Sequence, residues 1–70
     1  MTLNEIKSAL AQGKRVFQHH EGYEVLTGFY ADGEQYWNIV CLQNDYTIGL
    51  TWRDGKTMNG KPEEFFIWGE

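Results

Sequence analysis

Four turn-forming pairs, spaced about eleven residues apart, divide the central part of this 70-residue chain. They are Glu21-Gly22, Asp32-Gly33, Asn44-Asp45 and Asp54-Gly55. The segments between them are rich in Val, Ile, Thr, Tyr, Phe and Trp, the side chains that suit a pleated strand. Because Asp-Gly tolerates the positive φ angles of tight hairpins, this spacing predicts a four-stranded antiparallel meander.

The segment before the strands predicts an amphipathic helix. Thr2 is placed to cap it, and Glu5 three residues later completes a capping box. Apolar side chains at helical spacing form one stripe: Leu3, Ile6, Ala9 and Leu10. No linker interrupts residues 1–70, so we expect a single α+β domain. In this domain, one N-terminal helix packs on one face of a four- to five-stranded antiparallel meander sheet.

The turns also predict the strand register, if each of them is a two-residue hairpin. Leu26 then lies opposite Ile39, Ile39 lies opposite Leu50, and Phe17 lies opposite Leu26. The result is one apolar row, Phe17–Leu26–Ile39–Leu50, which we expect to lie under the helix. Cys41 falls on the same face and is predicted to be a packed thiol.

The other face of the predicted sheet carries side chains that one helix cannot cover. The apolar run 65–68 is predicted to pair as a fifth strand, and it either folds over this face or leaves it exposed for a partner. Aromatic side chains are favoured at such interfaces. The candidate partner-binding residues are Tyr23, Phe29, Tyr36, Asn38 and Val40.

Composition narrows the class of protein. The net charge of −4 and a pI near 5.0 argue against direct nucleic-acid binding, which normally uses a basic face. The single cysteine excludes an internal disulfide and fits a reducing compartment. No signal peptide and no apolar run of membrane-spanning length is recognisable. We therefore expect a cytoplasmic protein with no membrane contact and no cofactor.

Residues able to carry catalysis or bind a metal are few. His19 and His20 are adjacent, and adjacent strand residues point to opposite faces, so they do not share a metal ion. The predicted register brings Glu24 and Cys41 near His19, which leaves a small ligand-binding or enzymatic module as an alternative. The chain has no phosphate-binding glycine loop, no Cys-x-x-Cys pair and no serine nucleophile elbow. We predict that it is not an enzyme and has no metal site.

Three passages resemble small uncharacterised proteins of phages and bacterial prophages: "IKSALAQGKRV", "IVCLQND" and "IGLTWRDGKTMNGKPEEFFI". The resemblance covers most of the chain. It implies an accessory protein of the bacterial host cytosol that binds a host or phage protein, including as an inhibitor of a host defence complex. A homo-oligomeric structural protein is a further alternative, and self-association as a homodimer is compatible with the same surface.

A second passage, "GFYADGEQYWNIVCLQ", is similar to the strand–Asp-Gly–aromatic–strand segment of Tudor and other SH3-like barrels. That similarity implies an aromatic cage for a methylated side chain, built from Phe29, Tyr36 and Trp37. In the predicted register Trp37 faces away from the other two, so the cage is not assembled.

Overall fold

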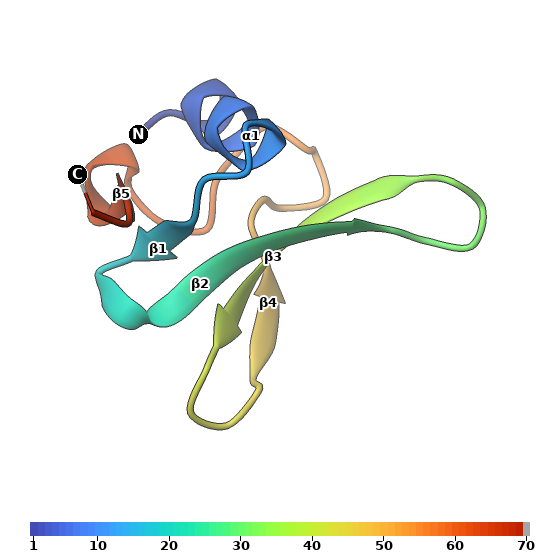
Figure 1. The fold of residues 1–70 in the computed structure, drawn as a ribbon. Coiled ribbons are helices and arrows are strands. Elements are labelled where there is room, and N and C mark those ends of the chain that lie inside the picture. The colour runs from blue at the N-terminus through green and yellow to red at the C-terminus, as the bar shows by residue number, and fades with distance from the viewer. Residues whose placement is uncertain (70) are drawn as a thin grey trace.

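The computed structural model describes residues 1–69, which form one α-helix and a five-stranded antiparallel sheet (Figure 1). The elements are α1 (Leu3–Ala11), β1 (Val16–Gln18), β2 (His20–Phe29), β3 (Gln35–Cys41), β4 (Thr47–Gly49), η1 (Pro62–Glu64) and β5 (Phe65–Ile67). The strand order is β4-β3-β2-β1-β5, a meander whose first strand also pairs with the C-terminal strand. The predicted α+β fold is confirmed. None of the helices in the described range is long and apolar enough to span a membrane.

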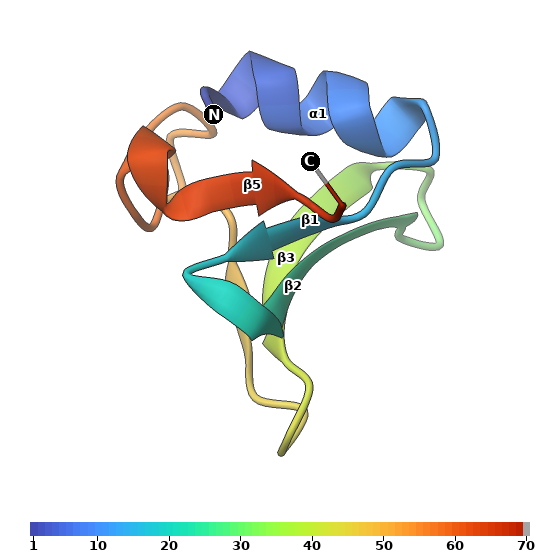
Figure 2. The same ribbon diagram turned by 60° about the vertical axis from the view of Figure 1, so that its left-hand side comes forward.

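Helix α1 begins at the predicted capping box. The Glu5 amide donates to Thr2 Oγ1 over 3.2 Å, and the Thr2 amide donates to Glu5 Oε1 over 2.7 Å. These two bonds satisfy amides that the helix itself leaves without partners. The helix lies across one side of the sheet (Figure 2). Its predicted stripe supplies the contact, with Ile6 and Ala9 fully enclosed.

One apolar core lies between α1 and the sheet. Its buried members are Ile6, Ala9, Val16, Val25, Ile39, Leu50 and Phe65. They come from the helix, from β1, β2, β3 and β5, and from the residue that follows β4. Burying such a side chain contributes roughly 1.5–3 kcal/mol, so this one layer supplies much of the stability of a small domain.

The register between β2 and β3 differs from the prediction by one residue. Val25 lies opposite Ile39, and Leu26 lies opposite Asn38. The cause is the connection, which is a five-residue loop (30–34) rather than a two-residue turn. Because side chains alternate along a strand, the shift places Val25 in the core and turns Leu26 to the outer face. The predicted burial of Leu26 under the helix is therefore wrong.

The other two connections shift the register by two residues, which leaves each side chain on its own face. Ile39 lies opposite Ile48 instead of Leu50, and Phe17 lies opposite Glu24 instead of Leu26. Because of the one-residue shift between β2 and β3, the predicted apolar row divides between the two faces of the sheet. Ile39 and Leu50 are in the core, as expected, whereas Phe17 shares the outer face with Leu26.

Three carboxylates outside the core fix the caps and turns of the fold. Amide and hydroxyl groups of Thr57, with the Lys56 amide, lower the pKa of Asp54 below its ordinary value of 3.8. Thr2 lowers the pKa of Glu5 in the helix cap, and the Gln18 side-chain amide lowers that of Glu64.

These pKa shifts predict an acid-sensitive fold. A carboxyl whose folded pKa is depressed contributes stability above its unfolded pKa, and this is lost as pH falls through the folded value. We expect a constant Tm above about pH 5 and a falling Tm below about pH 4.5. Asp54→Asn should flatten this acid dependence in calorimetric scans. Glu63→Gln is the control, because the Glu63 side chain makes no hydrogen bond within residues 1–69; an equal effect of both variants would contradict the assignment.

Candidate functional site

Three of the five predicted partner-binding residues lie together on the outer face, the side of the sheet away from α1. Tyr36, Asn38 and Val40 alternate along β3 and are half-buried. On β2, Leu26 is the cross-strand neighbour of Asn38, and its side chain is 41% exposed. Leu42 continues the same alternation past the end of β3 and is also exposed. We call Leu26, Tyr36, Asn38, Val40 and Leu42 the outer strip.

Tyr23 and Phe29 do not belong to this strip. They lie opposite Cys41 and Gln35, on the face that carries α1, because the one-residue shift affects every residue of β2. Phe29 is near the tip of the β2–β3 hairpin, beyond the helix, and is mostly exposed. Tyr23 lines a separate hollow of about 310 Å³ with Ile39 and Ile48. The prediction that Tyr23 and Phe29 share a face with Tyr36, Asn38 and Val40 is therefore wrong.

The C-terminal strand covers one end of the outer face. Phe17 is almost fully buried there, with ring centroids 5.9 Å from Phe66 and 5.7 Å from Trp68. The Arg15 guanidinium lies 5.0 Å from the centroid of the Phe17 ring. The C-terminal segment therefore closes the outer face at β1 and leaves Leu26 and Leu42 uncovered.

A partly buried ion pair lies beside this aromatic cluster. Arg15 Nε and Nη2 donate to the two carboxylate oxygens of Glu24, each over 2.9 Å. The Glu24 carboxylate is 11% exposed, and its hydrogen bonds raise the pKa of Arg15. Such a bidentate pair compensates the buried carboxylate. The ion pair thus stabilises the Glu24 carboxylate at the margin of the outer strip, opposite Val40.

A second feature is a groove of about 440 Å³ where β3 extends past the end of β4; we call it the edge groove. Its aromatic side chains are Tyr30, Tyr36, Trp37 and Trp52, and its basic side chains are Lys7 and Arg53. The Lys7 ammonium lies 4.1 Å from the centroid of the Trp37 ring, a cation–π contact. The Tyr30 and Tyr36 rings lie 5.0 Å apart.

Gly28 permits one wall of this groove. It lies opposite Tyr36, and a Cβ added at Gly28 would come within 2.4 Å of the Tyr36 hydroxyl oxygen. The tyrosine ring thus covers the glycine across the strand pair, an arrangement that compensates glycine in a sheet. Any side chain at position 28 would displace Tyr36 and reshape the groove.

The edge groove was not found from the sequence. Its residues come from α1, the β2–β3 loop, β3, the end of β4 and the loop after Leu50, and sequence spacing does not bring these together. The nearest signal was the Trp52-Arg53 pair beside a turn. After Leu50 the chain turns back on itself: the Trp52 amide donates to the Thr57 carbonyl over 2.8 Å, and Thr51 forms an isolated β-bridge with Met58.

The alternative site at His19, Glu24 and Cys41 is not brought together. Glu24 lies opposite Val40 rather than Cys41, so the carboxylate and the thiol occupy opposite faces of the sheet. The Glu24 carboxylate is bound by Arg15, and His19 Nε2 instead lies 3.6 Å from Glu64 Oε1. Cys41 is half-buried and its thiol is free. The register that suggested a Cys–His–Glu arrangement is wrong.

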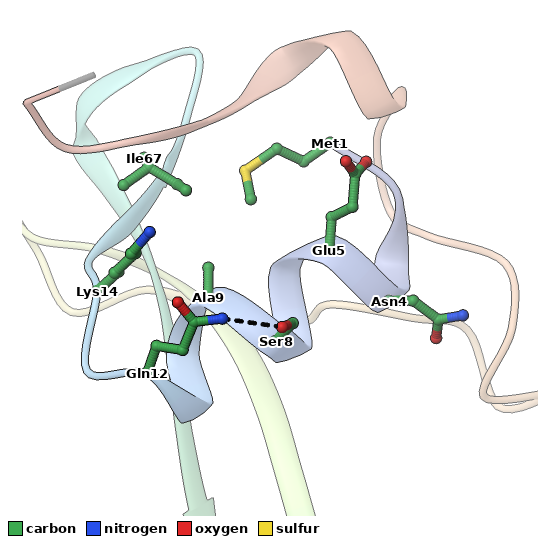
Figure 3. Close-up of a pocket in the computed structure, with 8 residues that line it drawn as sticks. All are labelled: Met1, Asn4, Glu5, Ser8, Ala9, Gln12, Lys14 and Ile67. Atoms are coloured by element: carbon green, nitrogen blue, oxygen red, sulfur yellow. Dashed lines mark hydrogen bonds between the residues drawn. The ribbon is translucent and has the colours of Figure 1, made fainter.

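A third hollow, of about 370 Å³, separates α1 from β5 (Figure 3). Met1 and Ile67 form its apolar side, and the Gln12 side-chain amide donates to Ser8 Oγ over 3.2 Å at its rim. Glu5 also lines the hollow, but its carboxylate accepts the hydrogen bond from the Thr2 amide in the helix cap. The hollow is a gap in the packing between α1 and β5.

Within residues 1–69, no group of three or more His, Cys, Asp or Glu side chains could hold a metal ion. Comparison with known proteins gave no match to a family model, to a curated protein or to a solved structure. Two surface features therefore remain as candidate sites: the outer strip, on the face away from α1, and the edge groove, which lies at the end of β4 and also reaches Lys7 of α1.

Proposed function

We propose that this chain is a non-enzymatic binding protein that contacts a protein partner through its outer strip. The observation that carries the proposal is the exposed apolar surface of Leu26 and Leu42 on a sheet whose helix α1 packs on the other side. Exposed apolar patches of this kind mark interaction sites.

The composition of the surface supports a protein partner. Aliphatic groups lie at the centre of the strip, with one amide from Asn38 between them. The aromatic side chain of Tyr36 lies at one end of the strip. The charges of Arg15 and Glu24, which lie beside the strip, are paired with each other. An apolar centre with aromatic anchors is typical of the buried middle of protein interfaces.

The phage and prophage resemblance gives the proposal its setting. We propose an accessory protein of a mobile element that acts in the host cytosol by binding a host or phage protein. Inhibition of a host defence complex is the form of this function that the resemblance favours. An exposed sheet face suits such a role, because it can cover a partner surface without any chemistry of its own.

Leu26→Asp is expected to weaken partner binding at least about tenfold, which corresponds to roughly 1.4 kcal/mol, because it places a charge in the middle of an apolar contact. Ile48→Asp is the matched control: Ile48 lies on the other face of the sheet and is 38% exposed, against 41% for Leu26. Tagged protein would capture partners from infected and uninfected bacterial lysates, and affinity for the recovered protein would be titrated for both variants.

Equal losses for the two variants, or none for Leu26→Asp, would contradict the proposal. Sedimentation of the purified protein tests the homo-oligomeric alternative separately. A mass that rises with concentration and returns to the monomer in Leu26→Asp would assign the strip to a second copy of the chain.

A further inference from the structure

Basic side chains gather in the edge groove although the protein as a whole is acidic. Two of the six Lys and Arg residues, Lys7 and Arg53, line it, whereas Glu34 is the one acid among its lining residues. The Arg53 side chain makes no hydrogen bond or ion pair within residues 1–69. The groove is therefore a local site of positive charge with an unengaged guanidinium.

The same groove presents flat aromatic surface. The Trp52 side chain is 63% exposed and makes no ring contact with the described part of the chain. The Tyr30–Tyr36 pair forms a second aromatic wall. Exposed rings next to cations are the combination that binds stacked bases together with their phosphates.

Polar groups are available between the rings and the cations. Asn38 and Thr51 are half-buried lining residues, and neither side chain makes a hydrogen bond within residues 1–69. An amide offers both donors and acceptors, which is what the edge of a nucleobase requires. The volume of about 440 Å³ lies in the range of small-ligand sites.

We propose that the edge groove binds a nucleoside phosphate. The base stacks on Trp52, the phosphates meet Arg53 and Lys7, and Asn38 contacts the base edge. This site goes beyond the proposed protein contact. The two surfaces adjoin at Tyr36 and Asn38, whereas Lys7, Trp52 and Arg53 lie outside the outer strip, so variants at these three positions test the groove separately. The acidic remainder of the chain disfavours a long nucleic-acid strand, because flanking phosphates would meet no continuous basic surface.

Isothermal titration of the purified protein with ATP, adenosine and inorganic triphosphate tests the assignment. We expect ATP to bind with a Kd below about 1 mM, and the other two probes at least about tenfold more weakly, because each lacks half of the recognised groups. Trp52→Ala and Arg53→Ala should each weaken ATP binding at least about tenfold. Both side chains are exposed, so the variants should fold, and thermal melts check this.

The matched controls are Tyr46→Ala for the aromatic ring and Lys56→Ala for the charge, since both are exposed and lie outside the groove. Three results would overturn the proposal. One is no ATP binding at about 5 mM, well above the expected Kd. A second is triphosphate binding as tight as ATP and insensitive to Trp52→Ala, which indicates a plain anion site. The third is tighter binding of an eight-nucleotide single strand than of ATP, which indicates a nucleic-acid surface.

Discussion

Val25→Asp should abolish folding, whereas Leu26→Asp should leave the domain folded. Val25 is completely buried in the core beneath α1, while the neighbouring Leu26 projects from the outer face. An unpaired carboxylate in that core costs more free energy than the few kcal/mol that a domain of this size has to spare. Far-ultraviolet circular dichroism and one-dimensional NMR of the two variants would measure the difference.

This pair of variants decides the register. The two-residue turn predicted from the sequence would bury Leu26 and expose Val25. With that turn, Leu26→Asp would unfold the domain and Val25→Asp would leave it folded. Val25→Asn serves as a control for charge, since it is nearly the same size as Asp and remains neutral. If Leu26→Asp unfolds the domain and Val25→Asp does not, the structural register of β2 is wrong.

The sequence predicted the elements of this fold well because each has a local cause. The capping box at Thr2 and Glu5, the apolar stripe of α1 and the turn residues between the strands all act within a few positions of one another. The pairing of the C-terminal run as a fifth strand was also predicted correctly.

The error that moved side chains to the wrong face of the sheet lies in one connection, because the other two connections shift the register by two residues and keep each side chain on its face. The Asp32-Gly33 pair alone predicts a two-residue turn, but the loop spans residues 30–34 and is closed by two backbone hydrogen bonds of Tyr30. The Tyr30 amide donates to the Glu34 carbonyl over 2.8 Å, and the Tyr30 carbonyl accepts the Gly33 amide over 2.9 Å. Both two-residue and longer hairpins suit an Asp-Gly pair, so turn residues alone do not fix the loop length.

This one-residue shift in register explains why the five predicted partner-binding residues lie on two faces of the sheet. It moved the whole of β2 by one position relative to β3, so Tyr23 and Phe29 parted from Tyr36, Asn38 and Val40. The prediction of residues within each strand was sound, since alternation along a strand does not depend on the loop. The sequence did not predict the pairing between strands. It also did not predict that Lys7, Trp37 and Arg53, which come from three separate elements, line one groove.

Phe17→Ala is expected to destabilise the domain by about 3–5 kcal/mol, a loss large enough to leave much of the protein unfolded. Its ring is buried although it lies on the outer face, because Phe66 and Trp68 of the C-terminal segment pack on it. Truncation removes both aromatic contacts and opens a cavity over β1. Urea denaturation followed by circular dichroism would measure the free energy of unfolding.

Phe29→Ala is the matched control, since it removes the same atoms from a side chain that is 70% exposed, against 2% for Phe17. We expect it to change the free energy of unfolding by less than about 0.5 kcal/mol. A milder variant, Phe17→Leu, should retain the fold and lose only part of the stability, because it keeps most of the apolar volume. If Phe17→Ala cost no more than Phe29→Ala, the C-terminal segment would not cover Phe17, and the exposed surface available to a partner would extend from the outer strip across β1.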